Sequence, residues 1–357
     1  MSPADGKRAS GEPGKESGAK SEAKSVVLKS KVRKSIALVS PAMREANNGN
    51  WHTAQRWSQF LSGHCDIALL AAWPPAQAHV NATSAPSIMI ALHARRSAAS
   101  IRAWAEAFPA KPLIVVLTGT DLYRDIHDDA AAHQSLALAT HLVVLQDDGL
   151  NALPAAWRSK AQVIYQSAAV LKPAVKSSRR FRAVMVGHLR TEKGPLTFMQ
   201  AAAQLQDQPI YFDQIGDALK PEFAERAEET HGQNPHYRWL AGLPRAVTRQ
   251  RIKRAHVLVN CSVMEGGAHV ILEAVQSATP VLASRISGNI GMLGADYAGY
   301  FPAGDAAALA ALVLRCAAEP AFLARLQTQC SRRATLFAPE AERRHVLNLV
   351  LAAINSP

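Results

Sequence analysis

The amino-acid sequence predicts an α/β fold made of two doubly wound domains in tandem. Short apolar runs rich in β-branched residues alternate with helix-length segments, which is typical of parallel sheets covered by helices on both faces. This alternation stops at a stretch rich in proline, serine and basic residues, LKPAVKSSRR (171–180), and then starts again. A length of 357 residues, 48% of them hydrophobic, provides enough apolar side chains for two cores.

The first domain is expected over residues 35–172. Its helices are expected at 51–62, 97–107 and 128–139. The runs between them are apolar at nearly every position and do not alternate between apolar and polar residues. Such runs indicate strands buried on both faces. They are SIALVS (35–40), DIALL (66–70), SIMIAL (87–92), LIVVLT (113–118), HLVVLQ (141–146) and AQVIYQ (161–166).

The second domain is expected over residues 173–336. Its strands are expected at FRAVMVG (181–187), PIYFDQIG (209–216), YRWLAG (237–242), HVLVNCS (256–262) and PVLAS (280–284). The last segment, 337–357, contains an apolar-periodic helix over 337–353 that is expected to pack back on the first domain. Doubly wound sheets bind ligands at the carboxyl ends of their strands, so the sequence predicts a site in a cleft between the domains.

Charge and composition limit the class of protein. Residues 1–34 hold nine Lys and Arg against four Asp and Glu, so this tail supplies about five of the net +12 charges. It lacks aromatic residues and is expected to be disordered. No apolar run is long enough for a membrane span, and the four cysteines lack zinc-ligand spacing. A cytoplasmic protein without a metal or a membrane partner is therefore expected.

The motif with the most chemistry is SVMEGGAHVILEAVQSATPVLAS (262–284). It leads from a strand through a glycine turn into a helix expected from about residue 267, where free backbone amides favour phosphate oxygens. Glu273 can accept hydrogen bonds from ribose hydroxyls, and Glu265 can do the same for a sugar. Solvated helix carboxylates are the alternative. The expected donor-binding residues here are Glu265, Gly266, Gly267, Ala268, His269 and Glu273.

A second motif, VGHLRTEKGPLTF (186–198), also joins a strand to a helix. Gly187 ends the strand, and Arg190 and Lys193 precede a Gly-Pro pair that suits a helix start. Two cations at a strand end can neutralise a diphosphate leaving group. A basic surface turn is the alternative.

Three polar segments at strand ends of the first domain are candidates for acceptor binding. They are SPAMREANNGNWHTAQRW (40–57), LHARRSAASI (92–101) and VLTGTDLYRDI (116–126). Residues 47–50 could form a backbone nest, and the basic residues invite an anion. A surface loop, a structural histidine and helix capping by Thr120 or Asp121 are the alternatives. The candidates are Arg44, Asn48, Gly49, Asn50, His93, Arg95, Arg96, Thr120, Asp121 and Arg124.

The order of these motifs resembles glycosyltransferase family 4 over residues 35–353. It comprises a Lys-Gly after the first strand of the second domain, two glutamates eight residues apart, and a glycine-rich loop (287–305) that could form another wall of the cleft. The resemblance implies a GT-B fold of two Rossmann-like domains facing across a cleft and a UDP-sugar as substrate. It implies Arg190 and Lys193 on the donor diphosphate, Glu265 on the transferred sugar and Glu273 on the ribose. Arg190, Lys193 and Glu265 are thus the expected catalytic residues.

Two departures from the family pattern mark this chain. The family often has an aromatic residue and then glycine after its first glutamate, where this chain has Gly266, Gly267, Ala268 and His269. An Asn-rich stretch, REANNGNWHTA, replaces the glycine-rich loop of the first domain.

Taken together, the five segments around Arg44, His93, Thr120, Glu265 and Gly288 are similar to those of the selenosugar synthases of selenoneine biosynthesis. That resemblance implies attack of selenophosphate on UDP-N-acetylglucosamine or UDP-glucose, with a carbon–selenium bond formed and UDP and phosphate released. The basic residues of the first domain would hold the anionic acceptor. No strong general base is required, because selenium in selenophosphate is expected to be anionic near neutral pH, by analogy with thiolates.

Two other functions remain open at the level of sequence. One is a family 4 enzyme that acts on a hydroxyl of a glycan or lipid. The other is a module that binds nucleic acid through the tail and a basic cleft, which would require aromatic residues interleaved with the basic ones. The tail contains none, so no nucleic-acid partner is expected. The oligomeric state is open.

Overall fold

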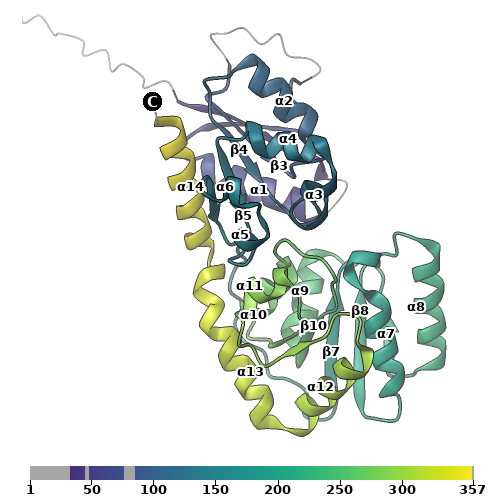
Figure 1. Cartoon of the computed structure of the whole chain (residues 1–357). Helices are drawn as coiled ribbons and strands as arrows, with labels where there is room; N and C mark the ends of the chain where they lie inside the picture. The colour runs from purple at the N-terminus through teal and green to yellow at the C-terminus, as the bar shows by residue number, and fades with distance from the viewer. Residues whose placement is uncertain (1–32, 45–47, 76–84, 356–357) are drawn as a thin grey trace, which may run out of the picture. The chain divides into compact units, whose positions relative to one another are not determined.

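The computed structural model describes residues 33–44, 48–75 and 85–355, which form two α/β domains (Figure 1). Each domain contains a six-stranded sheet whose strands are all parallel. The fold class expected from the sequence is therefore confirmed. The disorder expected for residues 1–34 falls outside the described residues except at Arg33 and Lys34, and so does Asn47.

The first sheet has the strand order β2-β1-β3-β4-β5-β6. Successive residues of β1 alternate between two apolar clusters, with Ala37 and Val39 in one and Ile36 and Leu38 in the other. This double burial explains why the strands are apolar throughout. Their bounds are β1 Ser35–Val39, β2 Asp66–Leu70, β3 Ile88–Leu92, β4 Leu113–Val116, β5 His141–Val144 and β6 Ala161–Val163.

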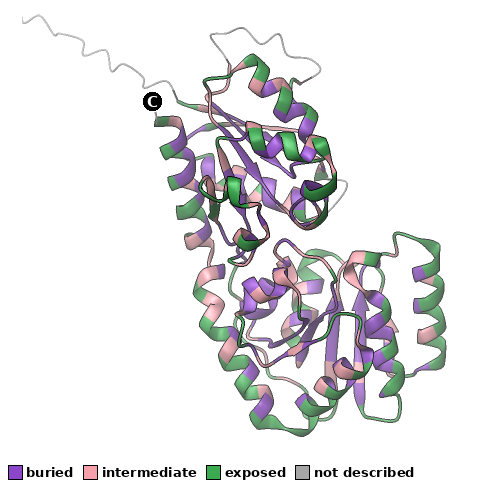
Figure 2. Ribbon diagram, viewed as in Figure 1, coloured by how far each residue is buried: buried purple, intermediate pink, exposed green. Residues whose placement is uncertain are grey.

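Helices cover both faces of this sheet. α2 and α4 share one apolar cluster with it, while α1 and the C-terminal helix α14 share the other. Trp57 and Leu61 of α1 are fully buried in the same cluster as Val346 and Val350 of α14. Figure 2 shows the strands coloured mostly as buried, while the helices carry both buried and exposed residues. The bounds are α1 Gly49–Leu61, α2 Ala98–Ala107, the π-helical turn η2 Asp121–Asp125, α3 Ile126–Asp128, α4 Ala130–Leu138, α5 Gly149–Ala152, α6 Ala155–Arg158 and α14 Pro339–Asn355.

The second sheet has the strand order β12-β11-β10-β7-β8-β9. Numbered within the domain, this is the order of dinucleotide-binding folds, and the direction of winding reverses between β7 and β10. Loops that follow these two strands therefore lie side by side at the carboxyl edge. The bounds are β7 Phe181–Val186, β8 Ile210–Ile215, β9 Tyr237–Trp239, β10 Val257–Asn260, β11 Val281–Ser284 and β12 Tyr300–Phe301.

The helices of the second domain pack around a separate core. One difference from expectation is α11, which occupies the first part of the predicted glycine-rich loop and buries Gly288 and Gly291. Strand β12 has only two residues and was not expected. The bounds are η3 Thr191–Lys193, α7 Pro195–Gln204, α8 Pro221–Gln233, α9 Arg245–Arg254, α10 His269–Val275, α11 Ser287–Leu293, α12 Ala306–Ala318, α13 Pro320–Arg333 and η4 Ala334–Phe337.

The chain passes between the domains twice. After β6 it runs through the buried residues Ile164–Ala168 into an extended segment that reaches β7. There the Ala168 amide donates to the Phe337 carbonyl at 3.2 Å, which joins the outgoing segment to the returning turn η4. The start of α14 therefore lies where the two crossings meet.

Among the described residues, no single helix is long and apolar enough to span a membrane. One pair, Ala306–Ala318 with Pro320–Asn355, passes the same test only when joined across a 105° bend. Leu309, Val313 and Leu326 of this pair are buried in the core of the second domain.

Candidate functional site

The loops after β7 and β10 meet through a lysine and a glutamate that were both predicted site residues. Lys193 Nζ donates to Glu265 Oε1, and the hydroxyl of Ser262 donates to the same oxygen at 2.6 Å. Both side chains are mostly buried, at 18% and 10% exposure. Because both of these contacts use Oε1, the other carboxylate oxygen of Glu265 remains available for a ligand hydroxyl within the described part of the chain.

Two glycines allow this approach. Gly194 has φ +59°, and a Cβ there would lie 2.3 Å from the carbonyl oxygen of Cys261. Only glycine adopts this left-handed conformation against the β10 loop without strain. A Cβ at Gly187 would lie 3.5 Å from two carbons of Lys193, so the stem of the lysine packs directly on this backbone.

Arg190 lies in the same loop but does not contact Glu265. Its Nε is 3.9 Å from Glu192 Oε2, while Arg124 of the first domain reaches Oε1 of the same glutamate at 3.8 Å. Glu192 therefore holds one predicted cation from each domain. The sequence interpretation assigned it no role, although it stands between the two predicted cations of its motif.

Glu273 lies on α10 and is 5% exposed. His269 Nδ1 is 3.4 Å from its Oε1, Arg245 donates to that atom from two nitrogens at 3.3 Å, and Arg249 Nε is 3.9 Å away. Burial raises the pKa of this carboxyl, but His269 and the two arginines outweigh burial and the pKa is lowered. Glu273 is thus an ionised acceptor, and these contacts, which all use Oε1, leave Oε2 available among the described residues.

Arg245 and Arg249 were not predicted. They lie four residues apart on α9, in the basic run RAVTRQRIKR, and so they lie on one side of that helix. This i, i+4 spacing was the available signal. Its meaning depended on the packing of α9 against α10, which the sequence did not show.

The glycine turn between Glu265 and α10 lies against the first domain. A Cβ at Gly266 would lie 2.5 Å from the carbonyl of Thr118, and one at Gly267 would lie 2.9 Å from Leu145 Cβ. An aromatic residue at either glycine would have no space, which accounts for the departure from the family pattern. The helix itself begins at His269, two residues later than expected.

His93 is buried at the end of β3 with φ +70°, an uncommon conformation for a non-glycine residue. The amide of Arg96 donates to its Nδ1 at 3.3 Å, and its Nε2 is 3.0 Å from Thr120 Oγ1. Burial lowers the pKa of His93, and Arg96 adds to this, against the opposing effect of Asp121 and Asp125. A neutral ring that accepts at Nδ1 carries its proton on Nε2, pointing it toward Thr120.

Asp121 is fully buried and holds the two strand ends together. Its carboxylate accepts from the backbone amides of Ala94, Thr118 and Gly119 at 2.8–3.0 Å. A carboxylate buried beneath three amides positions the loop and does not face a ligand. The sequence interpretation had placed Asp121 among residues that contact the acceptor, so this is a correction.

The remaining first-domain candidates divide into two groups. Arg95 pairs with Asp129 at 2.6 Å, and Arg124 pairs with Asp125 at 2.9 Å. Arg44 and Arg96 are exposed and form no ion pair with another residue that the structure describes. The cations available to an anion without breaking an existing pair are therefore these two.

The predicted nest at residues 47–50 is not present in its described part. Asn48 caps α1 instead, with Oδ1 accepting from the amides of Asn50 and Trp51 at 3.1 and 3.2 Å. Gly49 and Asn50 are the first helical residues. The Asn50 amide is already engaged by this cap, so the segment begins a helix in place of the predicted nest.

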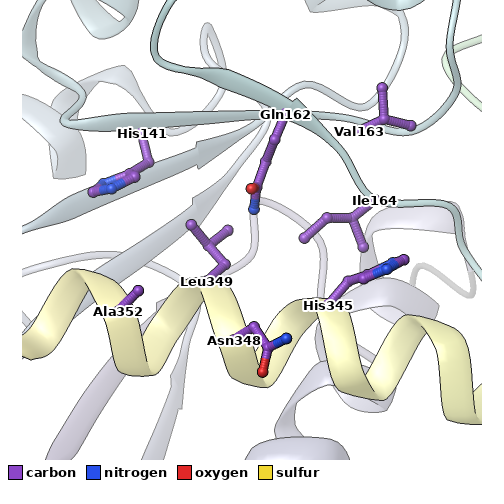
Figure 3. A pocket seen from close by; sticks show the side chains of 8 residues that line it. All are labelled: His141, Gln162, Val163, Ile164, His345, Asn348, Leu349 and Ala352. Carbon is purple, nitrogen blue, oxygen red and sulfur yellow. The ribbon is translucent and has the colours of Figure 1, made fainter.

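A pocket of about 420 Å³ lies elsewhere in the first domain (Figure 3). Its wall runs from His141, the first residue of β5, to Ile164, just after β6, and is closed on the other side by residues of α14. It is lined by His141, Gln162, Val163, Ile164, His345, Asn348, Leu349 and Ala352. In the described ranges no group of three or more His, Cys, Asp or Glu side chains could hold a metal ion.

The sequence of the second domain matches a known family of glycosyltransferases. Residues 170–336 match the family model described as Glycosyl transferases group 1. A protein of Xenopus tropicalis named glycosyltransferase 1 domain-containing protein 1 is 29% identical over 156 residues. This match spans 42% of the present chain and 43% of that protein, so the chain matches less than half the length of this relative.

Solved structures match the fold of nearly the whole chain. HepE of Anabaena, crystallised with UDP and glucose, has a TM-score of 0.70 at 15% identity and covers 90% of this chain and 100% of its own. The sucrose-phosphate synthase of Thermosynechococcus elongatus has a TM-score of 0.70 at 16% identity, with 90% and 99% coverage. A glycosyltransferase of Rickettsia africae has a TM-score of 0.71 at 14% identity, with 91% and 100% coverage. These findings show the GT-B fold and, with the matched family model, support a glycosyltransferase.

Proposed function

We propose that this protein transfers a sugar from a UDP-sugar to selenophosphate, and that it thereby makes a selenosugar. The observation that supports the donor half is the pair of glutamates at the switch point of the second sheet, of which Glu273 is buried and Glu265 is partly buried. Each is fixed by cations at Oε1 and leaves Oε2 available among the described residues. Structures with the same fold, such as HepE, contain UDP and glucose.

The donor roles follow from where each group lies. Glu273 accepts hydroxyl protons of the ribose, and Glu265 accepts from the transferred sugar. Lys193 and Arg190 lie in the β7 loop, where positive charge stabilises the diphosphate as the leaving group departs. No metal ion enters this proposal, because the two basic side chains supply the charge that the departing diphosphate needs.

The acceptor half rests on charge at the carboxyl edge of the first sheet. Arg44 and Arg96 are exposed and free of ion pairs with described residues, and the neutral His93 directs its Nε2–H toward the Thr120 hydroxyl. A small trianion suits such a surface better than an apolar acceptor. The sequence similarity to selenosugar synthases selects selenophosphate among small anions.

The proposed reaction balances in two steps. Anionic selenium attacks the anomeric carbon, the carbon–selenium bond forms, and the bond from that carbon to the UDP oxygen breaks to release UDP. Water then cleaves the selenium–phosphorus bond and releases phosphate, leaving the selenosugar. The protein contributes orientation of the two substrates and stabilisation of the leaving group.

The alternative is transfer to a hydroxyl of a glycan or lipid. A hydroxyl is a weak nucleophile, so that reaction needs a general base within hydrogen-bond reach of the acceptor. His93 is the histidine at this edge, but its Nδ1 accepts from the Arg96 amide and its Nε2 faces Thr120. The two carboxylates beside it are also engaged, Asp121 by backbone amides and Asp125 by Arg124. This arrangement favours the reaction that requires no base.

The donor half is tested by calorimetric titration with UDP. Replacing Glu273 with glutamine should weaken UDP binding by about 10- to 100-fold, because a hydrogen bond to an ionised group contributes about 1.5–3 kcal/mol. Glu340→Gln, an exposed change on α14, is the matched control and should bind as the original protein does. Equal UDP affinity in the Glu273 and Glu340 variants would remove Glu273 from the donor site.

A further inference from the structure

We infer that four side chains, Glu273, His269, Arg56 and Glu342, form a relay that couples donor binding to the junction where the chain crosses between the domains. The inference rests on the proposed donor site, since it takes Glu273 as the group that holds the ribose. His269, expected from the sequence to bind the donor itself, is in this inference a positioning residue together with Arg56, and both act through Glu273.

The relay is continuous from α10 to α14. His269 Nδ1 is 3.4 Å from Glu273 Oε1, and its Nε2 is 3.4 Å from an NH group of Arg56 on α1. Arg56 then donates to both oxygens of Glu342, from Nε at 2.7 Å and from its other NH group at 2.9 Å. Two carboxylates are thus joined through one imidazole and one guanidinium, across α10, α1 and α14.

Glu342 is the fixed end of the relay. Its side chain is fully buried at the start of α14, and it also accepts from Trp57 Nε1 at 2.7 Å and from Ser167 Oγ at 2.5 Å. Ser167 belongs to the first crossing segment, and the Glu342 amide donates to the carbonyl of Ala338, just before α14. Both crossings therefore contact the residue that Arg56 holds.

The hydrogen-bond directions require a neutral His269. Glu273 can only accept, so Nδ1 must carry the proton, and Nε2 is then an acceptor for Arg56, which can only donate. A protonated ring would present a second N–H toward the guanidinium and the contact with Arg56 would be lost. Protonation of the imidazole therefore turns the acceptor that faces Arg56 into a donor.

The charged groups around His269 favour this neutral state. Arg56 and His52 face it from α1, Arg245 from α9, and Glu273 from its own helix. Burial lowers the pKa of His269, and the two arginines lower it further, against Glu273. The relay is consequently intact at neutral pH and is disrupted as acid protonates the ring.

Coupling follows from linkage. Ribose hydroxyls bind the carboxylate whose orientation the relay fixes, so the ligand binds best when α1 lies against α10. By reciprocity, a bound donor stabilises that arrangement by the same factor. Removing either contact of His269, the one with Glu273 or the one with Arg56, should weaken donor binding without removing any group that touches the donor.

Two amide replacements at His269 test its contacts with Glu273 and with Arg56 separately. His269→Asn can place an N–H near the Nδ1 position, for Glu273, but has no acceptor near the Nε2 position that Arg56 contacts. His269→Gln can place its carbonyl oxygen near the Nε2 position, for Arg56, but has no donor near the Nδ1 position that Glu273 contacts. Arg56→Lys breaks the two-point contact with Glu342 while keeping the charge, which avoids leaving a buried carboxylate unpaired.

The experiment is calorimetric titration of the full chain with UDP at neutral pH. We expect all three variants to bind UDP at least about fivefold more weakly than the original protein. The double variant Arg56→Lys with His269→Gln should be no weaker than the weaker single variant, since the residues act as one unit. The matched controls His345→Asn, His345→Gln and Arg343→Lys, all exposed on α14, should leave affinity unchanged.

Measuring UDP affinity over a range of pH adds a second test. A purely structural role of His269 would not make the effect of its replacement depend on pH. The ratio of the original protein's UDP affinity to that of His269→Gln should fall toward one as the pH is lowered, because acid disrupts the relay only where histidine is present. Titration of the UDP phosphate cancels in this ratio.

The outcomes are distinct. If His269→Asn binds UDP as tightly as the original protein, His269 only orients Glu273 and the coupling is overturned. Additive losses in the double variant would overturn it as well. If the original protein itself does not bind UDP, the proposed donor site fails and the relay fails with it, whereas normal binding with unaffected variants overturns the relay alone.

Discussion

At the scale of single residues, the site depends on which atom of each carboxylate is already engaged. Lys193 and Ser262 both contact Oε1 of Glu265, and the cations around Glu273 also converge on its Oε1. The sequence motif predicted both glutamates from their spacing and their glycine turn. It could not predict Ser262, Arg245 or Arg249 as their partners, because those contacts arise from the packing of separate loops and helices.

Lys193 gives the most direct test at this scale. Replacing it with glutamine removes the charge that faces the departing diphosphate while keeping a polar side chain of similar length. We expect kcat to fall by about 100-fold or more, as when a preorganised charge stabiliser is lost. Initial rates of UDP release measure this, with the exposed linker variant Lys172→Gln as control. A kcat for Lys193→Gln equal to that of the control would exclude leaving-group stabilisation by this lysine.

At the scale of elements, the important feature is the contact between the Glu265–Gly267 turn and the ends of β4 and β5. The alternation of apolar runs predicted the strands, and their carboxyl ends predicted the edge that bears the site. The sequence did not predict that Gly266 lies against the Thr118 carbonyl, or that Asn48 caps α1 in place of forming a nest. Glycine and asparagine suit both a ligand loop and a close contact or cap, so composition alone could not separate them.

Gly266→Ala tests the contact. A Cβ 2.5 Å from a backbone carbonyl must displace the turn, and Glu265 with it. We expect kcat/KM to fall by about tenfold or more, since small displacements of positioned groups are costly in catalysis.

Gly232→Ala on α8 is the matched control, because a Cβ there meets nothing within 4 Å. Its activity should be unchanged, and its thermal midpoint should be equal or slightly higher, since alanine suits a helix better than glycine. An unaltered kcat/KM in Gly266→Ala would show that the turn does not need its position against β4.

At the scale of the whole molecule, the two-domain fold could be predicted because the apolar rhythm, the basic linker and the restart of the rhythm are all local in sequence. The coupling between domains could not be, because it joins residues far apart in the chain. Arg56 and Glu342 are separated by 286 positions and meet only through the packing of α14 against α1. Arg56 lies in the polar segment 40–57 but was not among its candidate residues, and Glu342 belongs to no motif.

The free energy of unfolding should depend on pH through His52 of α1, which lies near Arg245 of α9 and His269 of α10. Burial, with Arg245 and His269, lowers the pKa of His52 from 6.5 to about 4. Between these values the unfolded chain binds a proton at His52 that the folded chain does not, so the free energy of unfolding falls as the pH is lowered through this window.

Urea unfolding at pH 7 and pH 5 measures the effect. The loss of stability between these two pH values should be smaller in His52→Gln, which cannot take up the proton, than in the original protein. An equal loss in both would contradict the lowered pKa of His52.

The measurement that tests the central claim most directly is the mass of the product formed from UDP-N-acetylglucosamine or UDP-glucose and freshly prepared selenophosphate. The account predicts UDP release together with a sugar that carries selenium, and neither product when phosphate replaces selenophosphate or when Glu265 is changed to glutamine. UDP release with selenophosphate but without a selenium-bearing sugar, or equal turnover with phosphate, would contradict transfer to selenium at this site.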